Sequence, residues 1–167
     1  MKHNILMSFL AATVLLAVGC GGNGTSHTYS LTAIPITLSG PLMEGPNTAQ
    51  YEVSIDWNAI GPNVQGNVKE AMLTAATLYK EDGTALDGVT GVVVQLTADD
   101  ADMEEVAVLN PIPSGTAKAE LQMANKADAD DYFDSDKFYI VVDVTMAEEL
   151  WEDLPLLGDF TFEIKTK

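Results

Sequence analysis

Short segments in which apolar and polar residues alternate constrain the fold of this chain more than any other feature. Residues 51–58, 117–123 and 160–164 alternate strictly, and the alternating run 138–146 is the most apolar of all. A period of two residues is the pattern of a β-strand with one buried face. We therefore expect Phe138, Ile140, Val142 and Val144 to face a core together with Phe160, Phe162 and Ile164.

Several other segments predict strands without such strict alternation. Residues 29–38 have a β-rich composition but contain Pro35, which favours an edge strand. Short apolar strands are expected at 92–97 and 106–109. Residues 70–80 fit a strand, although the wider stretch 67–82 also fits a helical face. Consistency with the rest of the chain favours the strand, and one helix packed on the strands remains the alternative.

Turn residues separate these segments at regular intervals, for example Ser39-Gly40-Pro41 and Asn110-Pro111. About eight short strands divided in this way predict an all-β fold, an antiparallel sandwich of two sheets with immunoglobulin-like architecture. One helical turn is expected over Tyr132 and Phe133. Trp151 and the leucines at 154–157 are expected in a loop that covers the open end of the core.

The first twenty residues have the layout of a secretory signal. Lys2 gives a basic start, residues 5–18 form a nearly unbroken apolar run, and Gly19 precedes Cys20. The run is shorter than the roughly 20 apolar residues that span a bilayer. Because Cys20 is the only cysteine, an intrachain disulfide is impossible.

This end of the chain resembles the lipobox of bacterial lipoproteins, with Leu16 four places before Cys20. The resemblance implies that Cys20 is lipidated and becomes the first mature residue. It divides the chain into a signal peptide at 1–19, a lipidated cysteine with a flexible tether at 20–28, and one β-sandwich domain at 29–167. Gly21, in place of an acidic residue, implies sorting to the outer membrane.

From residue 92 onward, the order of elements resembles small, functionally uncharacterised bacterial lipoproteins with a single β-sandwich. The resemblance rests on a strand, an acidic loop, the run VAVLNPIP, a DDYF turn and two closing strands. It implies no catalytic residue. The expected role is binding or structural, at the cell envelope, with an envelope protein or glycan as partner and the membrane reached through the lipid.

The chain is strongly acidic, with a net charge of −17 and no arginine. Such a charge repels nucleic acid, so a nucleic-acid partner is excluded. Three explanations of the acidity stay open: solubility beside the membrane, adaptation to salt, and affinity for cations.

Two acidic loops are the weak candidates for a calcium site, because calcium prefers six to eight oxygen ligands. The first, at 98–105, contains Asp99, Asp100 and Asp102. The second, at 125–136, contains Asp128, Asp130, Asp131, Asp134 and Asp136. Neither matches the EF-hand spacing, and two solvated loops that repel each other are the expected outcome.

The sequence gives little indication of a catalytic or nucleotide-binding site. His27 falls in the expected tether, which is a poor position for a catalytic imidazole. Dinucleotide and phosphate-loop motifs are absent from the sequence. We expect no catalytic residue and no cofactor. The alternative is a carboxylate-based hydrolase of envelope glycans, which would show two carboxylates facing each other across a cleft.

Overall fold

The computed structural model describes residues 24–124 and 127–167. Its elements in chain order are β1 (Ser26–Leu38), β2 (Gly45–Ser54), α1 (Trp57–Ile60), β3 (Val68–Tyr79), β4 (Val89–Ala98), β5 (Ala101–Leu109), β6 (Lys118–Glu120), β7 (Gln122–Met123), the 3-10 turn η1 (Asp130–Phe133), β8 (Lys137–Met146) and β9 (Leu154–Thr166).

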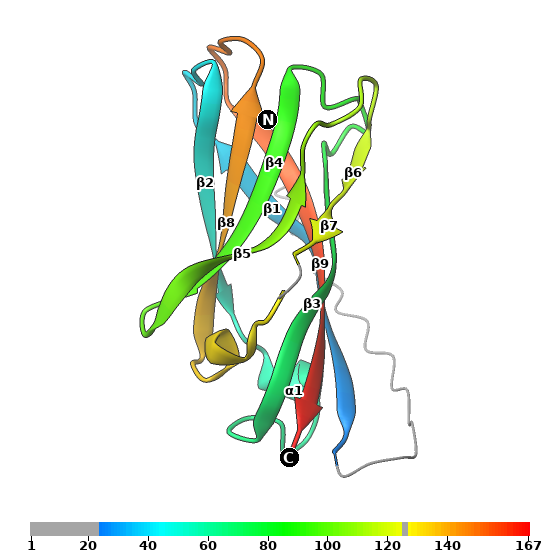
Figure 1. The fold of residues 1–167 in the computed structure, drawn as a ribbon, viewed down its shortest axis with the longest axis vertical. Helices are drawn as coiled ribbons and strands as arrows, with labels where there is room; N and C mark the ends of the chain where they lie inside the picture. The colour runs from blue at the N-terminus through cyan, green and yellow to red at the C-terminus, as the bar shows by residue number, and fades with distance from the viewer. Residues whose placement is uncertain (1–23, 125–126) are drawn as a thin grey trace, which may run out of the picture.

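Two antiparallel sheets pack face to face, which confirms the predicted β-sandwich (Figure 1). One sheet has the order β1-β9-β3-β6, and the other has the order β2-β8-β4-β5-β7. The pairing joins segments far apart in the chain: β1 lies against β9, and β2 lies against β8. The predicted edge strand that contains Pro35 is β1, at the edge of its sheet.

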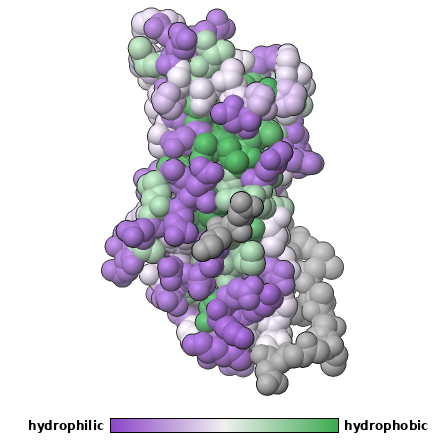
Figure 2. Space-filling model, viewed as in Figure 1, coloured by the Kyte–Doolittle hydropathy of each residue, from purple (hydrophilic) through white to green (hydrophobic). Residues whose placement is uncertain are grey.

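The aromatic part of the core forms between the two sheets, where β8 packs against β9. Phe138 and Phe162 are fully buried, with ring centroids 5.8 Å apart, and Phe133 from η1 packs against both at 5.5 and 5.4 Å. Ile140, Val142, Val144, Phe160 and Ile164 are also buried, so the predicted register of both strands is confirmed. Much of the visible face is hydrophilic, with an apolar strip in the region of β5–β7 (Figure 2).

The structure has a strand, β3 (Val68–Tyr79), in the stretch 67–82, and not a helix. Its residues pair with β9 over almost the whole length of the strand, with register shifts between Val68 and Glu70 and between Leu73 and Ala75. Those shifts explain why the apolar residues of this segment do not alternate cleanly, because a bulge changes which face the next residue occupies.

The strand expected at 51–58 begins and ends earlier than predicted, since β2 starts at Gly45. β2 ends at Ser54, and Trp57 begins the short helix α1. Asp56 caps this helix, since its side chain accepts from the backbone nitrogens of Asn58 and Ala59 at 3.1 and 3.2 Å. The prediction was wrong at Trp57 because an N-cap aspartate outweighs continued alternation.

The alternating segment 117–123 is two strands in different sheets. β6 pairs with β3, whereas β7 pairs with β5. Between them Leu121 is buried, and its backbone nitrogen donates to the carbonyl of Ala76 at 2.9 Å. The chain therefore crosses from one sheet to the other without breaking its sequence pattern.

Parts of two predicted loops are strand. Residues 101–105, expected in the first acidic loop, form the start of β5. Leu154 and Leu156, expected in a covering loop, are buried residues of β9, while Trp151 is 78% exposed and covers no core. Pro155 fits in β9 because β3 begins to pair with this strand only at Leu157, so β9 is an edge at the proline.

The tether predicted at 20–28 is also shorter than expected, since β1 begins at Ser26. His27 is therefore not in a tether: it is only 8% exposed and lies beside Gly61. Cys20 and the apolar run 5–18 lie outside the described residues. Among the described residues, no helix is long and apolar enough to cross a membrane.

Candidate functional site: an acidic basin between two loops

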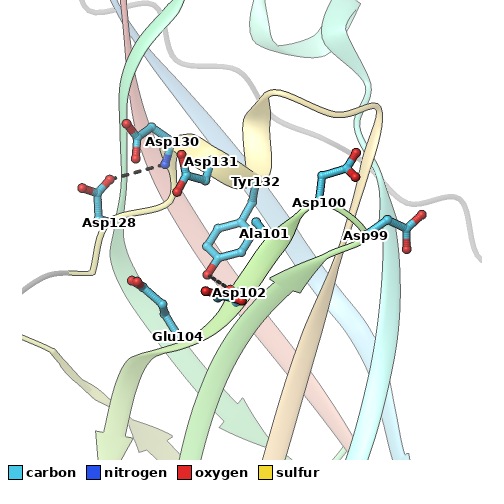
Figure 3. Close-up of a pocket in the computed structure, with 9 residues that line it drawn as sticks. All are labelled: Asp99, Asp100, Ala101, Asp102, Glu104, Asp128, Asp130, Asp131 and Tyr132. Carbon is cyan, nitrogen blue, oxygen red and sulfur yellow. Dashed lines mark hydrogen bonds between the residues drawn. The ribbon is translucent and has the colours of Figure 1, made fainter.

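The two acidic loops of the sequence meet at one cavity of about 500 Å³, which we call the acidic basin (Figure 3). Carboxylates make up almost all of its lining. The basin is lined by Asp99, Asp100, Ala101, Asp102, Glu104, Asp128, Asp130, Asp131 and Tyr132.

The first wall is the β4–β5 hairpin, which projects sideways from the sandwich (Figure 1). Asp99 and Asp100 form its turn, and Asp102 and Glu104 follow on β5. The exposed Asp99 carboxylate is 3.9 Å from the ammonium of Lys137. Because the ion pair is exposed, it adds little to stability.

The second wall is the segment 127–131, which is held on β3 by backbone hydrogen bonds. The nitrogen of Leu73 donates to the carbonyl of Ala127 at 2.9 Å, and the nitrogen of Ala129 donates to the carbonyl of Ala71 at 2.7 Å. Ala127 and Ala129 are buried. The extended backbone therefore turns the alternate residue, Asp128, outward to the basin.

Tyr132 connects the two walls. Its hydroxyl donates to the backbone carbonyl of Asp102 at 2.7 Å (Figure 3). Burial, followed by the nearby charges of Glu104 and Asp131, raises the pKa of Tyr132 to about 12. The neighbouring Phe133 is in the aromatic core, so the floor of the basin is part of the rigid sandwich.

The strongest electrostatic effect in the basin falls on Asp130. A side-chain hydrogen bond with Asp128, then burial, then the charges of Asp128 and Asp131, raise the pKa of Asp130 to about 6. A carboxyl group whose neighbours are carboxylates ionises at a higher pH, because a second negative charge beside the first is unfavourable. Asp130 therefore keeps its proton to a higher pH than an isolated aspartate does.

Six of the eight aspartates proposed as calcium ligands line the basin, and two do not. Asp134 ends η1 and is exposed. Asp136 accepts hydrogen bonds from the side chains of Trp57 and Gln65, both at 3.1 Å. Within residues 24–124 and 127–167, no three His, Cys, Asp or Glu side chains are grouped so as to hold a metal ion.

No family model and no curated protein matches this chain. The solved structure of infectious bursal disease virus Gx strain is similar over 93% of this chain, with 12% identity and a TM-score of 0.47. This chain covers 37% of that one. Desmodium yellow mottle tymovirus is similar over 91% of this chain and 93% of its own, with 15% identity and a TM-score of 0.31. Likenesses this weak carry no argument about function.

Sequence reasoning did not identify Tyr132 as a basin residue, although it predicted the helical turn that contains it. The residue's role depends on contact with β5, thirty residues earlier. The convergence of the two loops was not predicted either. It follows from the order of the strands, in which β8 and β5 lie on opposite sides of β4, and the sequence pattern does not show that order.

Proposed function

We propose that this chain is an exported lipoprotein, held in the outer membrane through acyl groups on Cys20, with a binding or structural role at the cell envelope. The observation that supports the proposal is the position at which the fold begins. β1 starts at Ser26, and the residues that the structure describes form a buried core. We assign export and anchoring to the N-terminal segment because its sequence has the layout of a lipoprotein signal.

The start of the domain is fixed to its end, which supports a short tether. The nitrogen of Thr166 donates to the carbonyl of Thr25 at 3.0 Å, and the hydroxyl of Ser26 donates to Glu163 at 3.0 Å. Five residues separate Cys20 from Ser26. At about 3.5 Å per residue they hold this end of the sandwich within roughly 20 Å of the lipid.

The acidity of the domain fits this arrangement. A protein with a net charge of −17 has little affinity for anionic headgroups, so it needs a covalent anchor to stay at a membrane. Each buried CH₂ of an acyl chain contributes about 0.8 kcal/mol, and two or more chains give stable attachment.

Fractionation of cells tests the anchor. Wild-type protein is expected in the outer-membrane fraction, and the Cys20→Ser variant is expected at precursor size or in the soluble fraction. Asn23→Ser changes the same segment without removing the thiol, and it is the matched control. Recovery of Cys20→Ser in the outer membrane at mature size would contradict the proposal.

The acidic basin favours one second candidate, a hydrolase of envelope glycans. Its two walls carry carboxylates on opposite sides of a cavity, and Asp130 has a pKa of about 6. A carboxyl group with a raised pKa can protonate a glycosidic oxygen, while a carboxylate on the opposite wall, such as that of Glu104, activates water or attacks the sugar. Water is added across the bond that breaks.

Release of reducing ends from envelope polysaccharide tests this candidate. Asp130→Asn is expected to abolish the release, and Asp134→Asn, which changes a carboxylate outside the basin, is expected to leave it intact. A wild-type protein that releases no reducing ends, or an Asp130→Asn variant with full activity, removes the hydrolase from consideration.

A further inference from the structure

A second cavity, of about 550 Å³, lies at the end of the sandwich where β1 finishes and β9 begins. It is formed by the turn after β3, at residues 80–84, and by the segment 150–155 that leads into β9. We call it the distal groove. Ser26 is at the opposite end of β1, which is 13 residues long.

The distal groove combines an apolar surface with acidic walls. Leu150, Leu154 and Pro155 provide the apolar part. Its acidic lining residues are Glu81, Asp82, Glu152 and Asp153. Among the described residues of the lining, Lys80 is the one positive charge, and its ammonium donates to the carbonyl of Ala85 at 2.9 Å.

Hydrogen bonds hold two of these carboxylates in place. The backbone nitrogen and the hydroxyl of Thr84 donate to Asp82 at 2.9 and 2.7 Å, and these bonds lower the pKa of Asp82. The backbone nitrogen of Gly40 donates to Asp153 at 2.8 Å. Both groups are therefore oriented before any ligand arrives, which reduces the entropy lost on binding.

The loops around the groove are also fixed to each other. Leu42 and Leu150 exchange backbone hydrogen bonds of 2.7 and 3.0 Å. The two loops approach so closely at Gly40 that an added Cβ would lie 2.8 Å from backbone atoms of Trp151 and Glu152. The side chains that these loops expose thus sit on a rigid base.

Two large apolar side chains are exposed on these loops. Trp151, between groove residues Leu150 and Glu152, is 78% exposed, and Met43 is 56% exposed. Tryptophan is among the residues that most often carry the binding energy of a protein interface. Burial of a side chain of this size against a partner removes a large apolar area from water.

We propose that the distal groove, together with Trp151, binds a basic peptide segment of a partner protein. A lysine or arginine side chain has an apolar stem and a charged head. The stem fits the surface of Leu150 and Pro155, and the head meets the acidic walls, whose four carboxylates outnumber the one lysine. An apolar residue next to the basic one packs on Trp151.

The acidic basin does not offer this combination, because the described residues of its lining include only Ala101 and Tyr132 besides carboxylates. The distal groove thus differs from the basin in having an apolar surface beside its carboxylates. On the anchoring proposed above, β1 runs away from the lipid for about 40 Å, so the groove faces outward from the membrane.

Fluorescence anisotropy with a labelled synthetic peptide of alternating lysine and leucine tests the proposal on full-length protein in nonionic detergent. We expect saturable binding that Trp151→Ala weakens about tenfold. The pair Glu81→Gln with Glu152→Gln is expected to weaken it to a similar extent. These residues are exposed, so an unchanged melting temperature establishes that each variant is folded.

The matched control is Asp130→Asn with Asp131→Asn, which removes the same charge from the acidic basin. We expect it to leave the affinity unchanged. An equal loss from both pairs would mean general attraction between opposite charges and would overturn the proposal. So would equal binding of a glutamate–leucine peptide, the absence of any binding, or self-association in the absence of peptide that Trp151→Ala abolishes. None of these readouts depends on Cys20. The proposal for the groove can therefore be contradicted while the proposal for the lipid anchor holds, and the reverse.

Discussion

The hydroxyl of Tyr132 donates to the backbone carbonyl of Asp102 at 2.7 Å, and this bond joins η1 to β5 across the acidic basin. Tyr132 is 3% exposed, so water does not replace the bond easily. The two acidic walls, which repel each other, are thus held together by a neutral group.

Removal of that hydroxyl should destabilise the protein. We predict that Tyr132→Phe lowers the free energy of unfolding by about 1 kcal/mol, the typical net contribution of one buried hydrogen bond. Urea denaturation measures the change. Tyr51→Phe, at a half-buried position on β2, is the control and should cost less. Equal losses would show that the bond to Asp102 has no special role.

The raised pKa of Asp130, beside Asp128, predicts an unusual pH dependence. The pKa of Asp130 is raised in the folded state to about 6, so its contribution to stability is present at low pH and is lost as the pH rises through 6. At pH 7 the Asp130→Asn variant should therefore be more stable than wild type, by no more than about 1 kcal/mol because solvent screens the pair.

The same comparison at lower pH provides the check. As the pH falls from 7 through 6 toward 4, Asp130 regains its proton in the folded protein, and the advantage of Asp130→Asn should disappear. Thermal unfolding across this range measures both proteins. A stability difference that is constant with pH would show that the two carboxyl groups do not interact.

The core register predicts unequal costs for neighbouring truncations on β8. Ile140→Ala and Val142→Ala should each lower the free energy of unfolding by about 1 to 4 kcal/mol, because both side chains are fully buried. Tyr139→Ala and Thr145→Ala, at half-buried positions, should cost less. A reversed order in urea denaturation would mean that the strand presents its other face to the core.

Strand positions and faces could be predicted from this sequence wherever a strand has one buried face. The alternation around Ile140 and Phe162 places these residues inward, and the structure has them there. In β5 the rule fails, because Asp102, Met103 and Glu104 are all exposed on a hairpin that projects beyond the core. No buried face is present there to impose alternation.

The pairing of the strands could not be predicted from the sequence, because alternation does not show which strands are neighbours in a sheet. β6 and β7 show this most clearly: one alternating segment is divided between two sheets at Leu121. The acidic basin has the same origin. Its aspartates were all visible in the sequence, but their meeting depends on β5 and the segment before β8 lying close together.

The calcium hypothesis makes a prediction that separates specific binding from screening. Because two solvated acidic loops repel each other, we expect the melting temperature to rise with ionic strength equally for calcium and sodium salts. The double variants Asp100→Asn with Asp102→Asn and Asp130→Asn with Asp134→Asn should retain this rise.

A rise specific to calcium would contradict that expectation. A site filled at a hundred times its Kd would add about 2.7 kcal/mol to the free energy of unfolding. Because the structure brings both loops to one basin, either double variant should then remove most of the effect.

The central claim is that Cys20 carries the lipid that anchors this domain. The most direct test is metabolic labelling with a fatty acid, followed by the intact mass of the purified protein. We predict label on the wild type but not on Cys20→Ser, and a mass equal to a chain that begins at Cys20 plus its acyl groups. A wild-type protein without label, or one whose mature chain begins at another residue, would contradict the account.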